Sequence, residues 1–383
     1  MLEIARAKTW LEISSSAVAN NLATLRSVLS EGAVLCAVVK ANAYGHGLDG
    51  MARLCSQNEV DIFGVDSIDE AQVVRGLVPR ATIFILGTTF KERAADVVRN
   101  SAIQTVASLE SLLELVEAAK SVGRKALVSL KLETGLNRQG IDGRELSAIM
   151  EAVKAADNWL EIVSVASHLA SSEEVEQPEP TMEQLQRFQL MCQSLEEQGL
   201  RPRYKHIACS AATLLYPASH GNLVRSGLAL YGLWPSAGVK RQVIFGKRRL
   251  ELMPALSWKT KLVQVKNVAP GARVGYGGSY VANRPMRLGV LPIGYYDGYD
   301  RRLANGGEVI IRGVRCPIVG KICMNMTMVD VSQVPGAKRE DAVILLGRDG
   351  MHAITADDLA EKLSTINYEV VTRLNPLIPR ITV

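Results

Sequence analysis

Short apolar runs and helical patterns alternate along the chain from about residue 33. Each run is rich in β-branched residues and is followed by a polar or Gly-containing turn. Near-continuous apolar runs of this kind are typical of strands in a parallel sheet covered by helices. They predict eight strands, at residues 33–40, 61–67, 81–87, 103–108, 127–133, 161–168, 204–210 and 223–231.

The segments between these runs carry apolar residues three and four positions apart. Residues 111–121 contain Leu112 and Leu115, and residues 181–199 repeat the spacing. A leading helix is predicted at residues 16–30 on the same grounds. Strand–helix units repeated over roughly 200 residues fit a (β/α)8 TIM barrel, an α/β architecture. A doubly wound sheet remains the alternative, although it would fit fewer strands.

The pattern changes after about Trp234. Pro, Gly and short Val/Ile-rich runs dominate there, which predicts a C-terminal mostly-β domain. We therefore expect the barrel over residues 1–240 and the β domain over residues 241–383, with the boundary in a basic stretch at 235–249. The expected strands are 259–268, 287–293, 307–312, 316–319, 326–331 and 342–346, with one helix at 356–363.

Composition narrows the class of protein. Of the 383 residues, 48% are hydrophobic and 22% charged, which excludes a disordered or fibrous chain. Aromatic residues make up 5% and the net charge of +5 is spread along the chain, so no nucleic acid is expected as a partner. The basic stretch is interpreted as a solvated linker. No apolar run approaches the ~18 residues of a membrane span, so no membrane partner is expected.

The N-terminal segment alternates charged and apolar residues without an apolar h-region, which favours a cytoplasmic location. The six cysteines are scattered, without a C-x-x-C pair or metal-ligand spacing. In a reducing compartment we expect them to be small buried apolar residues, and no metal site is predicted.

Lys40 closes the first predicted strand, within the stretch VVKANAYGHG at residues 38–47. In a barrel, a residue that ends a strand faces the C-terminal mouth, where the chemistry of this fold takes place. Partial desolvation there favours a neutral amine, the form that reacts with an aldehyde. The alternative is a strand-end lysine whose ammonium group simply reaches solvent.

Six blocks in order along the chain resemble the alanine racemases, fold-type III enzymes that use pyridoxal 5′-phosphate. The resemblance covers essentially the whole chain. It implies a barrel with a C-terminal β domain, a head-to-tail homodimer with shared active sites, and a small amino acid as substrate. The blocks are AVVKANAYGHG (37–47), KLETGLNR (131–138), RSGLALYG (225–232), VGYG (274–277), GYYDG (294–298) and CM (323–324).

The resemblance also implies roles for individual residues. Lys40 holds the cofactor covalently and handles the proton on the D side of the substrate, and Tyr276, contributed by the partner subunit, is the base on the L side. His168 lies beside the cofactor and the tyrosine. Arg225 faces the pyridine nitrogen, and a guanidinium cannot accept a proton from it. Without the resemblance, Tyr276 would be interpreted as a tyrosine in a turn and His168 as a buried core histidine. Arg225 would be interpreted as a member of a structural salt bridge.

The remaining contacts are assigned by the same resemblance. Arg138 lies near the cofactor and the substrate carboxylate, and Lys131 matches a lysine that is often carbamylated, although an ordinary Lys131–Glu133 pair stays open. Met324, from the partner chain, offers its backbone N–H to the substrate carboxylate, and Tyr295 lines the entrance corridor. The groups assigned to the phosphate are Tyr44, Ser210, the backbone N–H groups of Gly227 and Leu228, and Tyr368.

The implied reaction is the interconversion of L-alanine and D-alanine, which would supply D-alanine for peptidoglycan. The chain departs from the family pattern at Cys209, Tyr296, Asn325 and Met326, so a serine or broad-specificity racemase remains an alternative. Two further alternatives are a non-catalytic pyridoxal-phosphate carrier barrel, which would lack the second domain, and an aldolase-type barrel that needs no cofactor.

Overall fold

The computed structural model describes residues 7–246 and 250–383, which form two compact units. The barrel unit consists of Ser16–Ala43 and Leu48–Met253, apart from residues 247–249. The second unit consists of the described residues up to Ser15, Tyr44–Gly47 and Pro254–Val383. The short segment Tyr44–Gly47 is thus grouped with the second unit although its neighbours in the sequence belong to the barrel.

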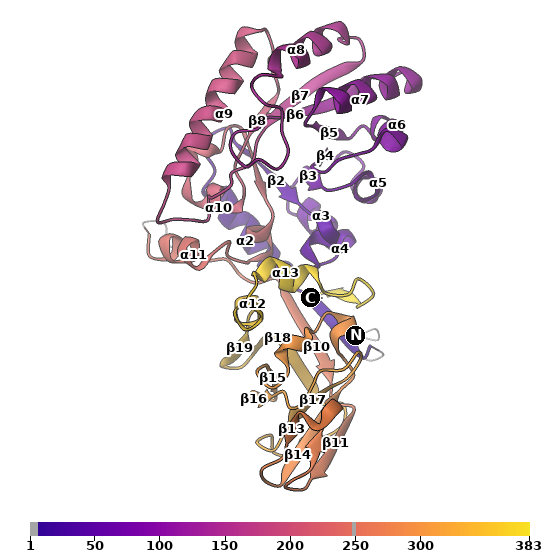
Figure 1. Cartoon of the computed structure of the whole chain (residues 1–383), viewed down its shortest axis with the longest axis vertical. Coiled ribbons are helices and arrows are strands. Elements are labelled where there is room, and N and C mark those ends of the chain that lie inside the picture. Colours follow the sequence, from indigo (N-terminus) through magenta and orange to yellow (C-terminus); the bar gives the residue numbers. More distant parts are fainter. Residues whose placement is uncertain (1–6, 247–249) are drawn as a thin grey trace. The chain divides into compact units, whose positions relative to one another are not determined.

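Eight parallel strands form the sheet of the barrel unit (Figure 1). Their order is β8-β7-β6-β5-β4-β3-β2-β9, so from β2 to β8 each strand pairs with the next in the chain, and β9 pairs with β2. The predicted eight-stranded α/β barrel is confirmed. The strands are β2 (Val34–Val38), β3 (Ile62–Val65), β4 (Thr82–Ile85), β5 (Ile103–Val106), β6 (Ala126–Lys131), β7 (Leu160–Ala166), β8 (Tyr204–His206) and β9 (Leu223–Ser226).

The barrel is nearly closed between β8 and β9. These strands share no ladder, but the N–H of Arg225 donates to the carbonyl of Ala208 at 3.1 Å, and the N–H of Asn222 donates to Lys205 at 3.3 Å. A doubly wound sheet would reverse its strand order at a switch point. Here β9 returns to pair with β2, so the alternative architecture is wrong.

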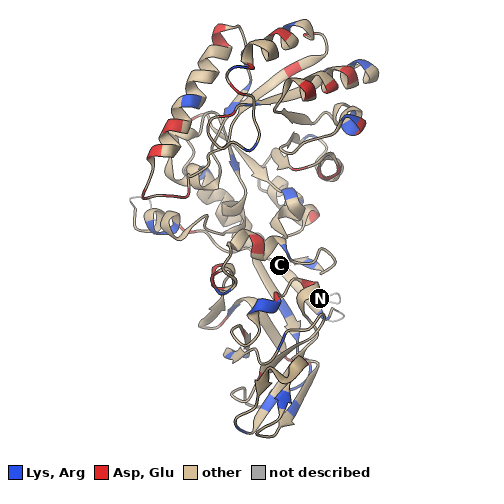
Figure 2. Cartoon of the chain, viewed as in Figure 1, with Lys and Arg blue, Asp and Glu red and all other residues tan. Residues whose placement is uncertain are grey.

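Helices follow the strands and cover the outside of the barrel (Figure 1), with acidic and basic residues interspersed along them (Figure 2). In the described part of the chain, no helix has the length and apolar composition needed to cross a membrane. The helices are α2 (Ser15–Ser27), α3 (Lys40–Tyr44), α4 (Leu48–Gln57), α5 (Ile68–Leu77), α6 (Lys91–Asn100), α7 (Leu109–Val122), α8 (Leu146–Ala155), α9 (Glu179–Glu197), α10 (Ser210–Leu215), α11 (Ala237–Ile244), and the 3-10 turns η1 (Pro217–Ser219) and η2 (Leu228–Tyr231).

Side chains from nearly every strand fill the interior of the barrel. Cys36 is fully buried there, and burial raises the pKa of its thiol to about 12, so it packs as a neutral apolar group. All six cysteines are free, and four of them are buried. One interior layer consists of Cys36, Ile62, Phe84, Ile103, Val163, Tyr204 and Leu223.

The second unit is mostly β, as predicted for the C-terminal part. Its main sheet has the order β16-β15-β18-β10-β1-β20, with β19 paired to β18, and two smaller sheets are β11-β14-β17 and β12-β13. The strands are β1 (Thr9–Ile13), β10 (Leu256–Lys261), β11 (Gln264–Val268), β12 (Arg273–Val274), β13 (Tyr280–Val281), β14 (Met286–Leu291), β15 (Glu308–Ile311), β16 (Val314–Pro317), β17 (Thr327–Asp330), β18 (Ala342–Asp349), β19 (His352–Ile354) and β20 (Arg380–Thr382). The helices are α12 (Ala356–Leu363), which matches the predicted helix, α13 (Asn367–Thr372), and the 3-10 turns η3 (Tyr276–Gly278), η4 (Tyr295–Asp297) and η5 (Arg301–Leu303).

The structure differs from the sequence-based division at two places. Strand β1, which lies within the range predicted as barrel, pairs antiparallel with β10 and parallel with β20, so it belongs to the second unit. The stretch 235–249 is not simply a linker, because α11 occupies Ala237–Ile244. The hydroxyl of Ser236 caps this helix by accepting the N–H of Val239 at 3.2 Å. Residues 247–249 of the predicted linker lie outside the described residues.

Candidate active site

The carboxyl ends of the barrel strands collect most of the polar residues singled out in the sequence. Lys40 follows β2, Lys131 ends β6, His168 follows β7 and Ser210 follows β8. Arg225 lies in β9, where it is the register partner of a β2 residue. Because the strands are parallel, these residues share the end of the barrel at which barrel enzymes carry their chemistry.

The segment after Lys40 is a single left-handed turn. Ala41, Asn42, Ala43 and Tyr44 have φ angles of 54°, 53°, 53° and 52°. This conformation costs roughly 1–2 kcal/mol per non-Gly residue, so the surrounding structure must hold it in place. Within the barrel unit, the side-chain oxygen of Asn42 accepts the N–H of Leu48 at 2.9 Å. Strained backbone of this kind concentrates at functional sites.

Lys40 is partly accessible to solvent. Its side chain is 39% exposed, and its Nζ forms an ion pair at 3.1 Å with Asp66, whose side chain is 56% exposed. Solvent reaches both partners, so the desolvation predicted for this amine is only partial in the single chain. The sequence analysis did not single out Asp66. Its position directly after a barrel strand was the available signal.

Arg225 is a buried cation with no acidic partner. The residue is 7% exposed, and no carboxylate of the described residues lies within ion-pair distance. Its Nη2 donates to the carbonyls of Ser167 at 2.7 Å and Ile207 at 3.3 Å, and Nη1 donates to that of His206 at 3.2 Å. Backbone carbonyls therefore satisfy the guanidinium in place of the salt bridge that is the ordinary alternative.

Two histidines contact this guanidinium and are held neutral. His168 Nδ1 lies 3.3 Å from Arg225 Nη2, and His206 Nδ1 is in close contact with Nη1. Burial, followed by the charge of Arg225, lowers the pKa of His168 to about 3 and that of His206 well below its usual value. Each Nδ1 then accepts a hydrogen bond from Arg225, so we assign the imidazole proton to Nε2. His168 is therefore a neutral donor through Nε2.

Lys131 lies in the same buried, cationic environment. The residue is 8% exposed, and burial, followed by the charges of Arg138 and Arg225, lowers its pKa to about 8. A substantial share of the amine is therefore neutral at mildly alkaline pH. Arg138 is itself exposed and follows β6, and its charge also acts on His168.

Glu133 does not pair with Lys131. Its carboxylate accepts the N–H of Gly135 at 2.5 Å, and in the described part of the chain no ion pair joins it to Lys131. Glu133 acts on Lys131 only as a more distant charge that raises its pKa. The ordinary Lys131–Glu133 pair considered from the sequence is therefore absent.

Several hydrogen-bond donors converge around Ser210, the first residue of α10. Its Oγ accepts the N–H groups of Gly227 at 3.1 Å and Ala229 at 3.3 Å. Leu228 is the first residue of η2, so its N–H has no partner inside that turn. A hydroxyl and a group of backbone N–H donors in one place can bind a phosphate.

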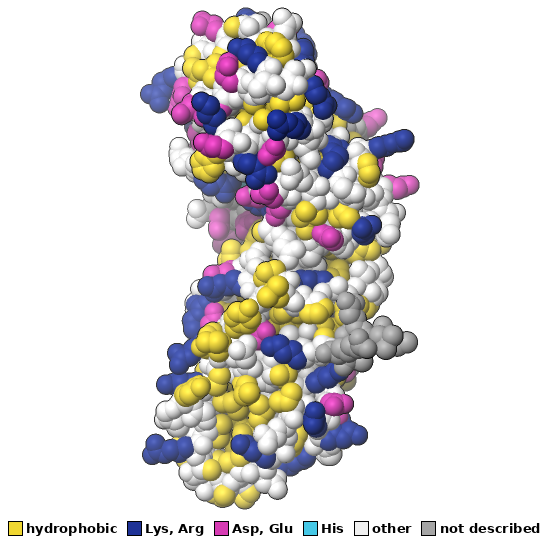
Figure 3. Space-filling model, turned by 90° about the vertical axis from the view of Figure 1, so that its right-hand side faces the viewer, with side chains coloured by type: hydrophobic (Ala, Val, Ile, Leu, Met, Phe, Trp, Pro, Cys, Tyr) yellow, Lys and Arg dark blue, Asp and Glu magenta, His cyan; other side chains and the backbone are white. Residues whose placement is uncertain are grey.

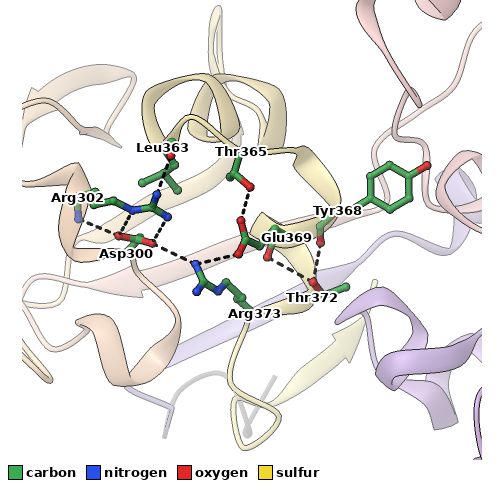
Figure 4. Close-up of polar contacts among 8 residues, drawn as sticks. All are labelled: Asp300, Arg302, Leu363, Thr365, Tyr368, Glu369, Thr372 and Arg373. Carbon is green, nitrogen blue, oxygen red and sulfur yellow. Dashed lines mark hydrogen bonds and ion pairs between the residues drawn. The ribbon is translucent and has the colours of Figure 1, made fainter. Parts of the chain in front are cut away.

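Tyr44 and Tyr368 lie together in the second unit. Their ring centroids are 6.1 Å apart, with an interplanar angle of 44°. Tyr368 comes from α13, and Figure 4 shows its ring directed away from the charged residues near the same helix. The two tyrosines predicted to contact the phosphate therefore come together, although 324 positions separate them in the sequence.

A group of ion pairs anchors α13 to the loop before β15 (Figure 4). Asp300 pairs with Arg302 at 2.9 Å and with Arg373 at 3.4 Å. Arg373 in turn pairs with Glu369 of α13 at 3.3 Å. Arg302 also donates to the carbonyl of Leu363, so the end of α12 is held by the same cluster.

Tyr276, Tyr295 and Met324 are exposed on the second unit, at 71%, 44% and 55%. The N–H of Tyr295 donates to the carbonyl of Cys323 at 3.1 Å, so Tyr295 and Met324 lie beside each other. The N–H of Met324 has no hydrogen-bond acceptor among the described residues. Tyr276 opens η3 after Gly275, whose φ of 74° favours glycine.

Comparison with known protein families identifies the chain. The family model described as "Alanine racemase, N-terminal domain" matches residues 13–235, and "Alanine racemase, C-terminal domain" matches residues 255–382. The chain belongs to the alanine racemase family. It is therefore an amino-acid racemase, an enzyme of the isomerase class, and the non-catalytic carrier interpretation is wrong.

Individual alanine racemases match along their whole length. The chain is 38% identical to the alanine racemase of Desulfosudis oleivorans over 380 residues, covering 97% of this chain and 96% of that one. It is 35% identical to that of Leptospira interrogans serovar Lai over 377 residues, covering 98% and 96%. The solved alanine racemase of Bacillus anthracis, with bound L-Ala-P, is 31% identical, covers 98% of this chain and 95% of that one, and has a TM-score of 0.92.

His206 joins the candidate site through its contact with Arg225, and sequence reasoning missed it. It is 1% exposed, and its ring meets that of Phe84 edge-on at 5.4 Å between centroids. Nothing in its local sequence marks it, because its importance comes from Arg225, which reaches it from the neighbouring β9.

Proposed function

We propose that this racemase interconverts L-alanine and D-alanine and uses pyridoxal 5′-phosphate as its cofactor. The observation that carries the proposal is Lys40 at the carboxyl end of the first barrel strand, in a chain whose similar proteins are named alanine racemases. The product would be D-alanine for peptidoglycan, and a cytoplasmic location remains the matching expectation from the sequence.

The donor groups of the barrel unit fit this cofactor. Lys40 supplies an amine for its aldehyde, and the donors around Ser210 suit its phosphate, to which we also assign Tyr44 and Tyr368. Arg225 has no acid beside it, so a ring nitrogen that faced its charge would stay unprotonated. When bound, pyridoxal 5′-phosphate delocalises the electron pair that the α-carbon keeps after losing its proton.

Inversion at the α-carbon requires that a proton leave one face and another arrive on the opposite face. We assign Lys40 to the D face and Tyr276, from the partner subunit, to the L face. A phenol has a reference pKa near 10, so its ionised form needs stabilisation to act as a base at neutral pH. The neutral His168, which donates through Nε2, is suited to give a hydrogen bond to the phenolate oxygen.

The substrate would be held by its carboxylate. Arg138 offers an exposed guanidinium, and Met324, which we assign to the site of the partner chain, offers a backbone N–H that has no acceptor in the described chain. Tyr295 lies next to Met324 and lines the proposed entrance corridor. A carboxylate held by two groups orients the α-hydrogen toward a base, which is the positioning that such reactions need.

A homodimer with shared active sites follows from this assignment. The second unit exposes Tyr276, Tyr296, Met324 and Met326 at 55–71%. Figure 3 shows hydrophobic side chains gathered on one face of this unit. Exposed apolar groups of this extent are typical of contact surfaces. In functional terms, the barrel predicted over residues 1–240 would hold the cofactor together with Tyr368, and residues 241–383 would also contribute Tyr276 and Met324 to the partner's site.

Incubation with amino acids in heavy water tests the reaction and its specificity. With L-alanine we expect deuterium at Cα and inversion toward equal amounts of the two enantiomers, and the same end point from D-alanine. With L-serine we expect much slower exchange, and with L-lysine and L-arginine none above background. Comparable rates for serine would favour the broader alternative. Absence of inversion with all four would contradict the proposal.

Lys131 is expected to carry a carbamate. Its neutral amine can attack CO2 to give a carbamate anion and release one proton, which would provide Arg138 with a negative partner in a cluster of cations. Since the pKa of Lys131 is about 8, occupancy should rise with pH through that value at fixed dissolved CO2 and be lost on acidification.

Native mass spectrometry in bicarbonate measures this carbamate. We expect one added CO2 per chain, which Lys131→Ala abolishes and the exposed control Lys125→Ala retains. The same added mass in the Lys131→Ala protein, or none in the wild type, would rule out the modification.

A further inference from the structure

We propose that Arg380, in the last strand of the chain, is a positioning residue that clamps the segment Tyr44–Gly47 to the loop after α13 and thereby orients Tyr44 and Tyr368. The inference rests on the proposed function in one respect, namely that these two tyrosines bind the cofactor's phosphate. The clamp itself rests on contacts within the second unit.

Arg380 uses its whole guanidinium on backbone carbonyls. Nε and Nη2 both donate to the carbonyl of Gly45, at 3.2 and 3.1 Å. Nη1 donates to the carbonyls of Asn375, Pro376 and Ile378 at 2.8, 2.9 and 2.6 Å, and Nη2 also reaches Leu374 at 3.3 Å. One side chain therefore ties the segment that follows Lys40 to the loop that joins α13 to β20.

No acid competes for this guanidinium. Arg380 forms no ion pair with a carboxylate of the described residues, and burial lowers its pKa to about 10. A half-buried cation without an acid is stable only if its donors are satisfied, and here five carbonyls satisfy them. A lysine would keep the charge but could not reproduce the planar fork that spans both segments.

The clamped segment fits closely against α13. A Cβ on Gly45 would lie 1.9 Å from the carbonyl oxygen of Val371 in α13, and one on Gly47 would lie 3.3 Å from the Arg380 side chain. Gly45 and Gly47 also have φ angles of 80° and 99°. This close approach places Tyr44 beside Tyr368, so displacement of the segment would separate the two rings.

The clamp also lies next to the strained turn. Tyr44 is the last residue of the left-handed turn, and the carbonyl that Arg380 holds belongs to the next residue. The ion pairs of Asp300 and Arg373 fix the other side of α13 (Figure 4). Arg380 therefore holds the segment Tyr44–Gly47, which begins with the last residue of the turn, against a helix that is itself anchored.

Hydrogen exchange and cofactor affinity together test the clamp. In Arg380→Lys we expect backbone exchange of residues 41–47 to rise by roughly 10-fold or more, since charge-assisted hydrogen bonds to Gly45 are lost, while β10 and β18 exchange as in the wild type. We expect pyridoxal 5′-phosphate, followed by absorbance, to bind about 10-fold more weakly. The matched control is Arg315→Lys, whose side chain donates to Glu308 and Ala353 in the same unit and should change neither reading.

A double-mutant cycle with Tyr44→Phe shows whether Arg380 acts through the tyrosine. If it does, the affinity losses of Arg380→Lys and Tyr44→Phe are less than multiplicative in the double variant. Unchanged backbone exchange of residues 41–47 in Arg380→Lys would refute the clamp. Faster exchange with unchanged cofactor affinity would refute its action on the tyrosines. Multiplicative losses of cofactor affinity in the double variant would refute that action as well. A wild-type protein that binds no pyridoxal 5′-phosphate would instead overturn the proposed function, and the exchange data would still decide the clamp.

Discussion

A Lys40→Ala variant should lose racemase activity by about 10⁴-fold or more and should no longer retain pyridoxal 5′-phosphate covalently. One amine performs two tasks in the proposed reaction, attachment of the cofactor and proton transfer on the D face, and positioned acid–base groups alone contribute about 10²–10⁴-fold. Borohydride reduction followed by denaturation and mass measurement reports attachment, and optical rotation reports turnover.

The fold should survive this substitution, so the loss can be assigned to chemistry. The Lys40 side chain is 39% exposed and its ion pair with Asp66 is solvated, and pairs of this kind contribute little stability. Lys91→Ala, at an exposed position at the start of α6, is the matched control and should behave like the wild type. Covalent retention of the cofactor by the Lys40→Ala protein would place the reactive lysine elsewhere.

The barrel could be predicted because its strands are buried on both faces. Most of them read as near-continuous apolar runs, and all eight predicted runs overlap a strand of the barrel. Strand β1 gave no such signal. Its sequence TWLEI is short and contains an acid, and its burial is conferred by β10 and β20, which come more than 240 positions later. Non-local pairing of this kind leaves no local pattern to recognise.

Short elements of the second unit escaped prediction for a related reason. Strands β12, β13, β19 and β20 contain two or three residues each, and α13 contains six, which is too few for either periodicity to show. By contrast, α12 matches the predicted helix at 356–363, and in the structure Thr355 and Asp358 form a capping box at its start.

The candidate site could be predicted where family motifs cover it and not where contacts define it. Lys40 and Arg225 stand in blocks that can be recognised in the sequence. Asp66 and His206 became visible only through the partners they meet, Lys40 and Arg225. The partial exposure of Lys40 agrees with its predicted position at a strand end, but that position alone does not reveal its ion pair with Asp66.

Tyr276→Phe should slow racemisation about 10²–10⁴-fold in both directions, because inversion needs a base on each face whichever enantiomer is the substrate. The removed hydroxyl is on a residue that is 71% exposed in the single chain, so stability and covalent retention of the cofactor should not change. Tyr280→Phe, a few residues away in β13, is the control and should keep wild-type turnover.

Exchange without inversion separates the two bases in this variant. With Lys40 intact, D-alanine should still exchange its Cα hydrogen with heavy water and keep its configuration. The Cα hydrogen of L-alanine should instead exchange no faster than L-alanine racemises. The reverse pattern, exchange of L-alanine with retention, would assign the two faces the other way round. Equal loss of exchange from both enantiomers would indicate that Tyr276 does more than act on one face.

Hybrid dimers of the two inactive variants test whether each site is shared. If Tyr276 acts in the partner's site, a dimer of one Lys40→Ala chain and one Tyr276→Phe chain has one site with both substitutions and one with neither. Isolated through two different tags after co-expression, it should recover about half of the wild-type activity. If both bases came from one chain, every site in the hybrid would lack one of them. The hybrid would then be as inactive as its parents, which would contradict the shared site while leaving the role of each residue intact.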